Sequence, residues 1–233
     1  MASRPKVNRG GVPRPASPPW TYVTNFPLAE FPISGERNWI GGHTIGLDWS
    51  DLGTISGHTY GTVIAPGYDD PTALLTGVWG PDQRARGIVF SADPQDIPNQ
   101  EVELRLRSSL SAHNCTGYEI GWRVSSNREA YMGITRWNGR LGDFTTLVTH
   151  YGERFGVSNG DVIEAIAIGN VISAYKNGEL QARIKDGTFR TGAPGMGTDW
   201  GPGTNTNFGL SQFMATDQVA DAPTSYWHDF FKR

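Results

Sequence analysis

The chain is patterned as short apolar runs separated by residues that favour tight turns. The clearest example is Val162–Ile168, Val171–Tyr175 and Leu180–Ile184, where Gly169-Asn170 separates the first two runs and Asn177-Gly178 the last two. Glycine and asparagine tolerate the positive φ that hairpin turns require. This stretch therefore predicts a three-stranded antiparallel meander.

Strict alternation marks a second region. Apolar Val102, Leu104 and Leu106 alternate with four charged residues, which are Glu101, Glu103, Arg105 and Arg107. Residues 118–124 repeat the pattern, with Glu119 and Arg123 between apolar positions. Successive side chains of a strand point to opposite faces. We expect two strands with an apolar core face and a charged, solvated face held together by ion pairs.

The same reading predicts short strands along most of the chain. They are Trp39–Ile40, Ile45–Asp48, Thr59–Ile64, Ala73–Trp79, Ala85–Phe90, Tyr131–Trp137, Phe144–His150 and Phe208–Met214. Asn138-Gly139 is expected to form a hairpin turn. The glycine-rich stretch from Gly192 to Gly203 is expected to be a long loop.

Composition supports an all-β protein. The 233 residues include 30 Gly and 15 Pro, and no stretch is long and helical in pattern. Many short strands, tight turns and one core predict a two-sheet antiparallel jelly-roll sandwich with an extended N-terminal arm. The expected organisation is a Pro-rich basic arm (1–20), a sandwich domain (21–217) and an aromatic tail (218–233).

Charge is distributed unevenly. Residues 1–29 carry four basic residues and no acidic one, which leaves 16 basic against 23 acidic residues in the body. A broad nucleic-acid footprint on the body is therefore not expected. The basic arm and the aromatic tail are the candidate contacts with neighbouring subunits in an oligomer or assembly, through Arg4, Lys6, Arg9, Arg14, Trp227 and Phe230.

The first residues contain no apolar segment of the kind that export signals need. No apolar run approaches the length of a membrane span. We expect cytoplasmic synthesis without export by the general route.

The second half of the chain carries a family resemblance. The run GDVIEAIAIGNVISAYKNGE, then FRTGAPGMG and FGLSQFMATD, resembles the C-terminal half of concanavalin A-like lectin/glucanase domains, laminin-G-like members included. Pro27-Leu28, Trp39 and Trp49 also resemble the start of bacterial and phage-borne versions. The resemblance implies a jelly-roll fold, but the superfamily contains lectins, glycanases, lyases, adhesive modules and virion proteins, so it assigns no function.

Glycan cleavage is one alternative. A sandwich glycanase needs two carboxylates across one sheet face, and the E-x-D-x-x-E strand typical of such enzymes is absent. The nearest candidates are the glutamates at 101, 103 and 119. With Arg105, Arg107, Arg123 and Arg136 expected on the same face, their pKa values should be low, which makes poor general acids. A polysaccharide lyase that uses these arginines and Tyr131 is a further alternative. The sequence resembles only part of the strand motifs of such lyases.

Other chemistry has less support. The five histidines lack metal-ligand spacing, and the single Cys115 excludes an internal disulfide. Loop carboxylates are the candidates for a calcium ion, which prefers oxygen ligands; they are Asp48, Asp51, Asp69 and Asp70. Exposed aromatic side chains that stack on sugar rings are expected among Tyr68, Trp79, Trp137 and Trp200.

Taken together, these patterns predict a non-enzymatic structural, adhesive or glycan-binding jelly-roll module of a larger assembly, such as a phage virion decoration or tail protein. The alternative is a polysaccharide hydrolase or lyase that acts on the charged sheet face, through Glu103, Glu119, Arg105, Arg123 and Tyr131.

Overall fold

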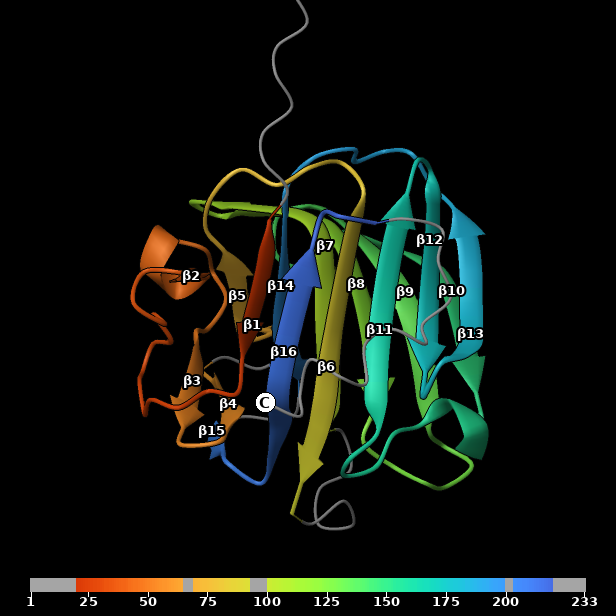
Figure 1. Cartoon of the computed structure of the whole chain (residues 1–233), viewed down its shortest axis with the longest axis horizontal. Coiled ribbons are helices and arrows are strands. Elements are labelled where there is room, and N and C mark those ends of the chain that lie inside the picture. The colour runs from red at the N-terminus through yellow and green to blue at the C-terminus, as the bar shows by residue number, and fades with distance from the viewer. Residues whose placement is uncertain (1–19, 65–68, 93–99, 200–202, 220–233) are drawn as a thin grey trace, which may run out of the picture.

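The chain folds as two packed antiparallel sheets with a small third sheet at one side (Figure 1). This computed structural model describes residues 20–64, 69–92, 100–199 and 203–219. The six-stranded sheet has the order β1 (Thr21–Thr24), β16 (Phe208–Thr216), β6 (Gln83–Ser91), β11 (Val162–Ile168), β12 (Val171–Lys176) and β13 (Glu179–Lys185).

The seven-stranded sheet lies behind the first in Figure 1. Its order is β10 (Phe144–Tyr151), β9 (Tyr131–Gly139), β8 (Asn114–Arg123), β7 (Glu101–Ser111), β14 (Ala193–Asp199), β5 (Thr72–Leu75) and β2 (Trp39–Gly41). The small sheet contains β15 (Gly203–Asn205), β4 (His58–Val63) and β3 (Leu52–Ile55). The described helices are the short 3-10 turns η1 (His43–Ile45) and η2 (Glu153–Phe155), and neither could cross a membrane.

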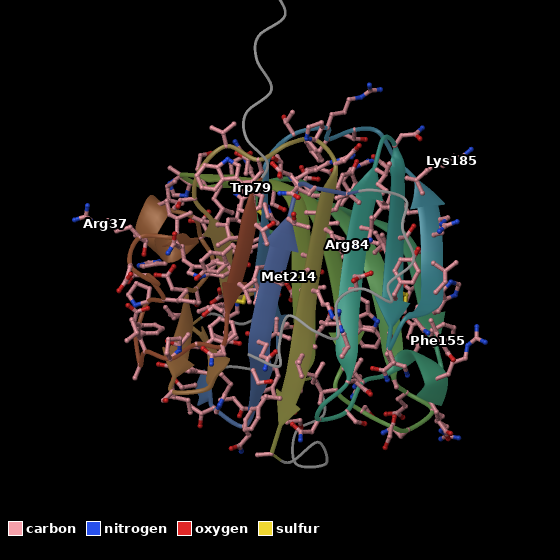
Figure 2. The ribbon with its side chains drawn as sticks, viewed as in Figure 1. Arg37, Trp79, Arg84, Phe155, Lys185 and Met214 are labelled. Atoms are coloured by element: carbon pink, nitrogen blue, oxygen red, sulfur yellow. The ribbon has the colours of Figure 1, made fainter. Side chains whose placement is uncertain are left out.

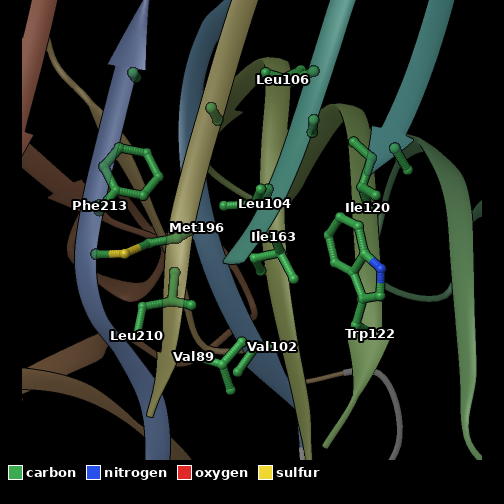
Figure 3. Packing of buried hydrophobic residues seen from close by; sticks show 14 of the residues in the cluster. Val89, Val102, Leu104, Leu106, Ile120, Trp122, Ile163, Met196, Leu210 and Phe213 are labelled. Carbon is green, nitrogen blue, oxygen red and sulfur yellow. The ribbon is translucent and has the colours of Figure 1, made fainter. Parts of the chain in front are cut away.

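The core lies between the two large sheets. Leu104 and Trp122 from the seven-stranded sheet face Phe213 and Ile163 from the six-stranded sheet (Figure 3). All four side chains are fully buried. The alternation in β7 and β8 therefore predicted the core face correctly, and the all-β two-sheet jelly roll is confirmed.

The meander forms as the turn residues predict. β11, β12 and β13 pair antiparallel in sequence order. Gly169 and Asn177 both adopt positive φ, at 57° and 51°. The Asn177 side chain also accepts a hydrogen bond from the Val162 backbone at 2.8 Å, which fixes the start of β11.

Three local predictions are wrong. The glycine-rich stretch after Gly192 contains β14, which pairs with both β7 and β5 inside the seven-stranded sheet. Residues 45–48 form part of a turn around η1 instead of a strand. β9 continues through Asn138 and Gly139, and the chain turns just after them, where the Asp143 backbone donates to the Arg140 carbonyl.

The turn around η1 folds over the outer face of the seven-stranded sheet. Its Leu47 and Trp49 side chains form a second apolar cluster with Cys115 of β8 and Trp137 of β9. The rings of Trp49 and Trp137 meet edge-on at 4.4 Å between centroids. This cluster covers part of the outer face, and a hollow remains beside it.

Candidate functional site

A cleft of about 280 Å³ opens on the outer face of the seven-stranded sheet. Its floor lies where Gly121 of β8 pairs directly with Gly133 of β9, so neither strand places a side chain there. Aromatic side chains and threonines line its walls together with five acidic residues, which are Asp70, Glu101, Glu103, Glu119 and Asp199.

Glu101 stands at one end of this floor. Its Oε2 accepts a hydrogen bond from the Tyr131 hydroxyl, and its Oε1 extends over Gly121, where an added Cβ would lie 1.7 Å away. Burial and the neighbouring charge of Glu119 raise the pKa of Glu101 to about 8. The nearby charge of Glu101 and burial raise the pKa of Tyr131 as well. At neutral pH the Glu101 carboxyl therefore carries a proton beside the cleft.

Arg105 lies beneath the other end of the cleft. Its Nη2 atom is 2.5 Å from Glu103, 3.1 Å from Glu119 and 3.8 Å from Asp70. The guanidinium also lies over the Trp49 ring at 5.0 Å, and the residue is only 1% exposed. One buried cation thus serves three carboxyl groups from three segments of the chain.

This imbalance determines the protonation of the cluster. Burial and the charge of Glu119 raise the pKa values of Asp70 and Glu103 well above their usual range, although Arg105 opposes the shift. The pKa of Arg105 is itself raised, because the charges of Glu103 and Glu119 outweigh the effect of burial. The predicted low pKa values are therefore wrong for Glu101 and Glu103. The predicted ion pairs are present, but the face that holds them is buried instead of solvated.

A glycine strand creates the space for this cluster. An added Cβ at Gly197 of β14 would lie 2.2 Å from Glu103 Oε2 and 3.2 Å from Arg105 Nε. The glycines that resembled a loop in the sequence therefore allow long polar side chains of β7 to lie flat against β14.

The four calcium candidates do not converge. Asp48 contacts His113 at 2.8 Å, Asp51 accepts hydrogen bonds from Thr44, and Asp69 accepts them from Ser50. Asp70 alone of the four joins the cleft. Its carboxyl oxygen lies within 4.8 Å of those of Glu103 and Glu119. Three such oxygens suit a hard cation, but the Arg105 guanidinium already lies against all three.

The predicted arginine-rich face is only partly present. Arg107 lies within a bulge of β7 and points instead to the backbone carbonyls of Pro81 and Gly169. Arg136 lies on the opposite side of β9, where it binds Asp186. Arg123 shares the outer face, but its guanidinium reaches the Glu129 carbonyl at 3.5 Å. The arginines that a lyase would use against uronate groups are therefore not gathered in the cleft.

The aromatic candidates also differ from expectation. Trp79 is 7% exposed and lies near one end of the sandwich (Figure 2), where its indole donates to the Thr76 carbonyl. Trp137 is 2% exposed; it lines the cleft wall and donates to Glu119 at 2.5 Å. The prediction that these two indoles are exposed is wrong. Tyr68 and Trp200 lie outside the described residues.

The exposed aromatic ring of the site is Tyr151 at the end of β10. It is 70% exposed, borders the cleft and lies 6.1 Å from the Tyr131 ring. Phe144 lines the opposite part of the wall against Trp137. Sequence reasoning missed Tyr151 because nothing in the strand pattern distinguishes a ring at the cleft edge from a ring in the core.

The partner-binding candidates of the two ends lie outside the described residues. They are Arg4, Lys6, Arg9 and Arg14 in the arm, and Trp227 and Phe230 in the tail.

Neither protein-family models nor curated proteins match the sequence. Solved structures do. The potassium-bound carbohydrate recognition domain of Emp46p is similar over 84% of this chain and 96% of its own, at 10% identity and a TM-score of 0.53. A prokaryotic β-1,3-1,4-glucanase (lichenase) from a mouse hindgut metagenome covers 85% and 99%, at 13% identity and a TM-score of 0.52. The apo Crh5 transglycosylase covers 87% and 89%, at 12% identity and a TM-score of 0.50.

These similarities concern the fold. The chain has the concanavalin A-like jelly-roll sandwich that the sequence resemblance implied, a fold that serves both carbohydrate recognition and carbohydrate cleavage in these neighbours. At such low identity the similarity transfers no activity or residue role.

Proposed function

We propose that this protein binds a glycan chain in the cleft over the Gly121–Gly133 pair. The observation that carries the proposal is the cleft itself, a hollow with acceptor-rich polar walls and an exposed aromatic ring at its edge. Sugar rings present hydroxyl donors for carboxyl oxygens and C–H faces for stacking on a ring such as Tyr151. The fold supports the proposal, because a carbohydrate recognition domain shares it.

Filling the floor tests the site without removing any polar group. At Gly133 the nearest atoms to an added Cβ lie at 3.7 and 3.8 Å, so Gly133→Val fits the strand and occupies the hollow. A glycan array on the wild type identifies a ligand, and calorimetry then compares the variants. We expect Gly133→Val to weaken binding at least tenfold with an unchanged melting temperature.

Gly187→Val is the matched control. Gly187 lies in the turn after β13, outside the cleft, and an added Cβ there makes contacts of 3.4 Å or longer. This variant should bind as the wild type does. Equal binding by all three proteins would place the glycan elsewhere and contradict the proposal.

A hydrolase is the second candidate, because the Glu101 pKa of about 8 gives the cleft a protonated carboxyl at neutral pH. A glycosidase needs such an acid beside a second carboxylate, and the candidate is Glu119, whose charge acts on Glu101. Glu103 is 1% exposed and lies 2.5 Å from Arg105, whereas Glu119 is 8% exposed and lies 3.1 Å from it. The test is reducing-sugar release from a bound polymer, which Glu101→Gln should abolish. A wild type that binds the polymer and releases nothing is a binding module only.

We further propose that the module acts within a larger assembly, such as a virion, to which the basic arm attaches it. The support is the proline-rich composition of residues 1–20 and their four basic residues. Deletion of residues 1–19 should abolish incorporation or oligomerisation and leave the melting temperature of the body unchanged. Unaltered assembly of the deletion variant would contradict this role.

A further inference from the structure

The polar groups at the floor of the cleft act mainly as acceptors. The Tyr131 hydroxyl and the Trp137 indole are donors, but both already donate to carboxyl groups, those of Glu101 and Glu119. Threonines 135, 146 and 149 supply hydroxyl groups on the β9 and β10 side. A ligand must therefore bring donors to the acidic side.

The charge of the lining has one sign. Five carboxyl groups line the cleft, and none of its described lining residues is a lysine, arginine or histidine. Arg105 and Arg123 lie outside the lining: Arg105 is buried against three of the acids, and the Arg123 guanidinium is directed to the Glu129 carbonyl. A cleft with low-dielectric walls and one sign of charge concentrates ligands of the opposite sign.

We propose that the ligand is a glycan that carries free amino groups, with glucosamine-type units seated between Glu101 and Glu119. This inference rests on the proposed function and names the ligand class of the same cleft. A protonated amine supplies three donors and one positive charge. An amino group therefore supplies both the hydrogen-bond donors and the positive charge that the acidic lining of the cleft favours.

Other sugar classes fit less well. A uronate or sulfated unit adds acceptors and negative charge to a site that already has an excess of both. An N-acetylated unit presents one amide donor without charge and adds a carbonyl acceptor. Burial and then the charge of Glu119 raise the pKa values of Asp70, Glu101 and Glu103. A bound ammonium group would favour the ionised form of these carboxyls and lower their pKa values.

The test is calorimetry on the full chain at pH 6 with three probes of equal length. These are hexamers of glucosamine, of N-acetylglucosamine and of galacturonate. We expect the glucosamine hexamer to bind at least tenfold more tightly than the N-acetylated one and the galacturonate hexamer to show no binding. The preference should decrease as salt is raised, because charge–charge attraction is screened.

A charge variant gives the second arm. Glu119→Gln should reduce the preference for the free amine at least fivefold. Glu179→Gln, an equal charge change at an exposed position of β13 in the other sheet, should leave it unchanged. The amino-glycan inference is overturned, and glycan binding stands, if the free and acetylated hexamers bind equally. The same holds if all three hexamers fail to bind while a glycan array finds another ligand whose binding Gly133→Val weakens. If the array is also blank, the proposed function itself fails.

Discussion

At the scale of one residue, the raised pKa of Glu101 is the property of the site that can be measured most readily. The unfolded chain releases this proton near the ordinary glutamate pKa, close to 4.5, whereas the folded protein retains it until about pH 8. Between these values the native state binds the extra proton, so the free energy of unfolding falls as pH rises. The stability that Glu101 contributes is fully present below about pH 4.5 and is lost progressively as the pH rises to about 8.

Glu101→Gln should remove this pH dependence. A glutamine amide accepts the Tyr131 hydrogen bond but does not ionise, so the variant should gain stability relative to the wild type by up to about 1.4 kcal/mol per pH unit between pH 5 and 8. Urea unfolding of both proteins across this range measures the difference. Glu179→Gln serves as the control, and a constant difference between Glu101→Gln and wild type would show that the Glu101 pKa is not raised.

Single residues also show where sequence reasoning fails. Alternation correctly placed Glu103, Arg105 and Glu119 opposite the core, but it assigned that face to solvent. Their burial depends on Trp49 and Asp70, which lie far away in sequence and approach only after folding. Local periodicity contains no information about such contacts, so the direction of the Glu103 pKa shift was predicted with the wrong sign.

At the scale of the element, the turn around η1 is the part that the sequence predicts least well, and it supports the cleft wall from behind through Trp137. The sequence indicated a strand there, because Ile45 and Leu47 alternate with polar residues. In the structure these side chains join the apolar cluster of Trp137 and Leu110 instead, so the segment lies against a residue of the cleft wall. β14 shows the opposite error, because its glycines were interpreted as a loop and form a strand. Gly195 and Gly197 leave room for the neighbouring side chains of Leu74 and Glu103, which the sequence pattern does not reveal.

Trp49→Ala should loosen this turn. The fully buried ring packs on Trp137, and deletion of a buried aromatic side chain costs about 3–5 kcal/mol. Cys115 lies in the same cluster, where burial raises its pKa to about 12. Urea unfolding should show the loss of stability, and a thiol reagent should react faster with the native variant than with the wild type.

The control for this experiment is Leu180→Ala, which truncates a half-exposed side chain of β13. It should change the free energy of unfolding by less than about 1 kcal/mol and leave the thiol rate unaltered. A Trp49→Ala protein with wild-type stability and an unreactive thiol would show that the turn does not cover the sheet.

At the scale of the whole molecule, the two sheets have different roles. The meander, which the turn residues predict well, belongs to the six-stranded sheet and provides scaffold. The cleft lies on the outer face of the other sheet and draws its lining from β7, β8, β9, β10, β14 and the segment before β5. The fold was therefore predictable from periodicity and turns, whereas the site required six segments to be brought together in space.

Mapping the ligand on the protein is the direct test of glycan binding in the cleft. Amide and indole NMR spectra of the labelled wild type would be recorded as an array-selected oligosaccharide is added. We expect the shifts to concentrate on Gly121, Gly133, Tyr151 and the Trp137 indole N–H, which donates to Glu119. Shifts confined to the six-stranded sheet, or an undisturbed Trp137 indole at saturation, would contradict glycan binding in the cleft.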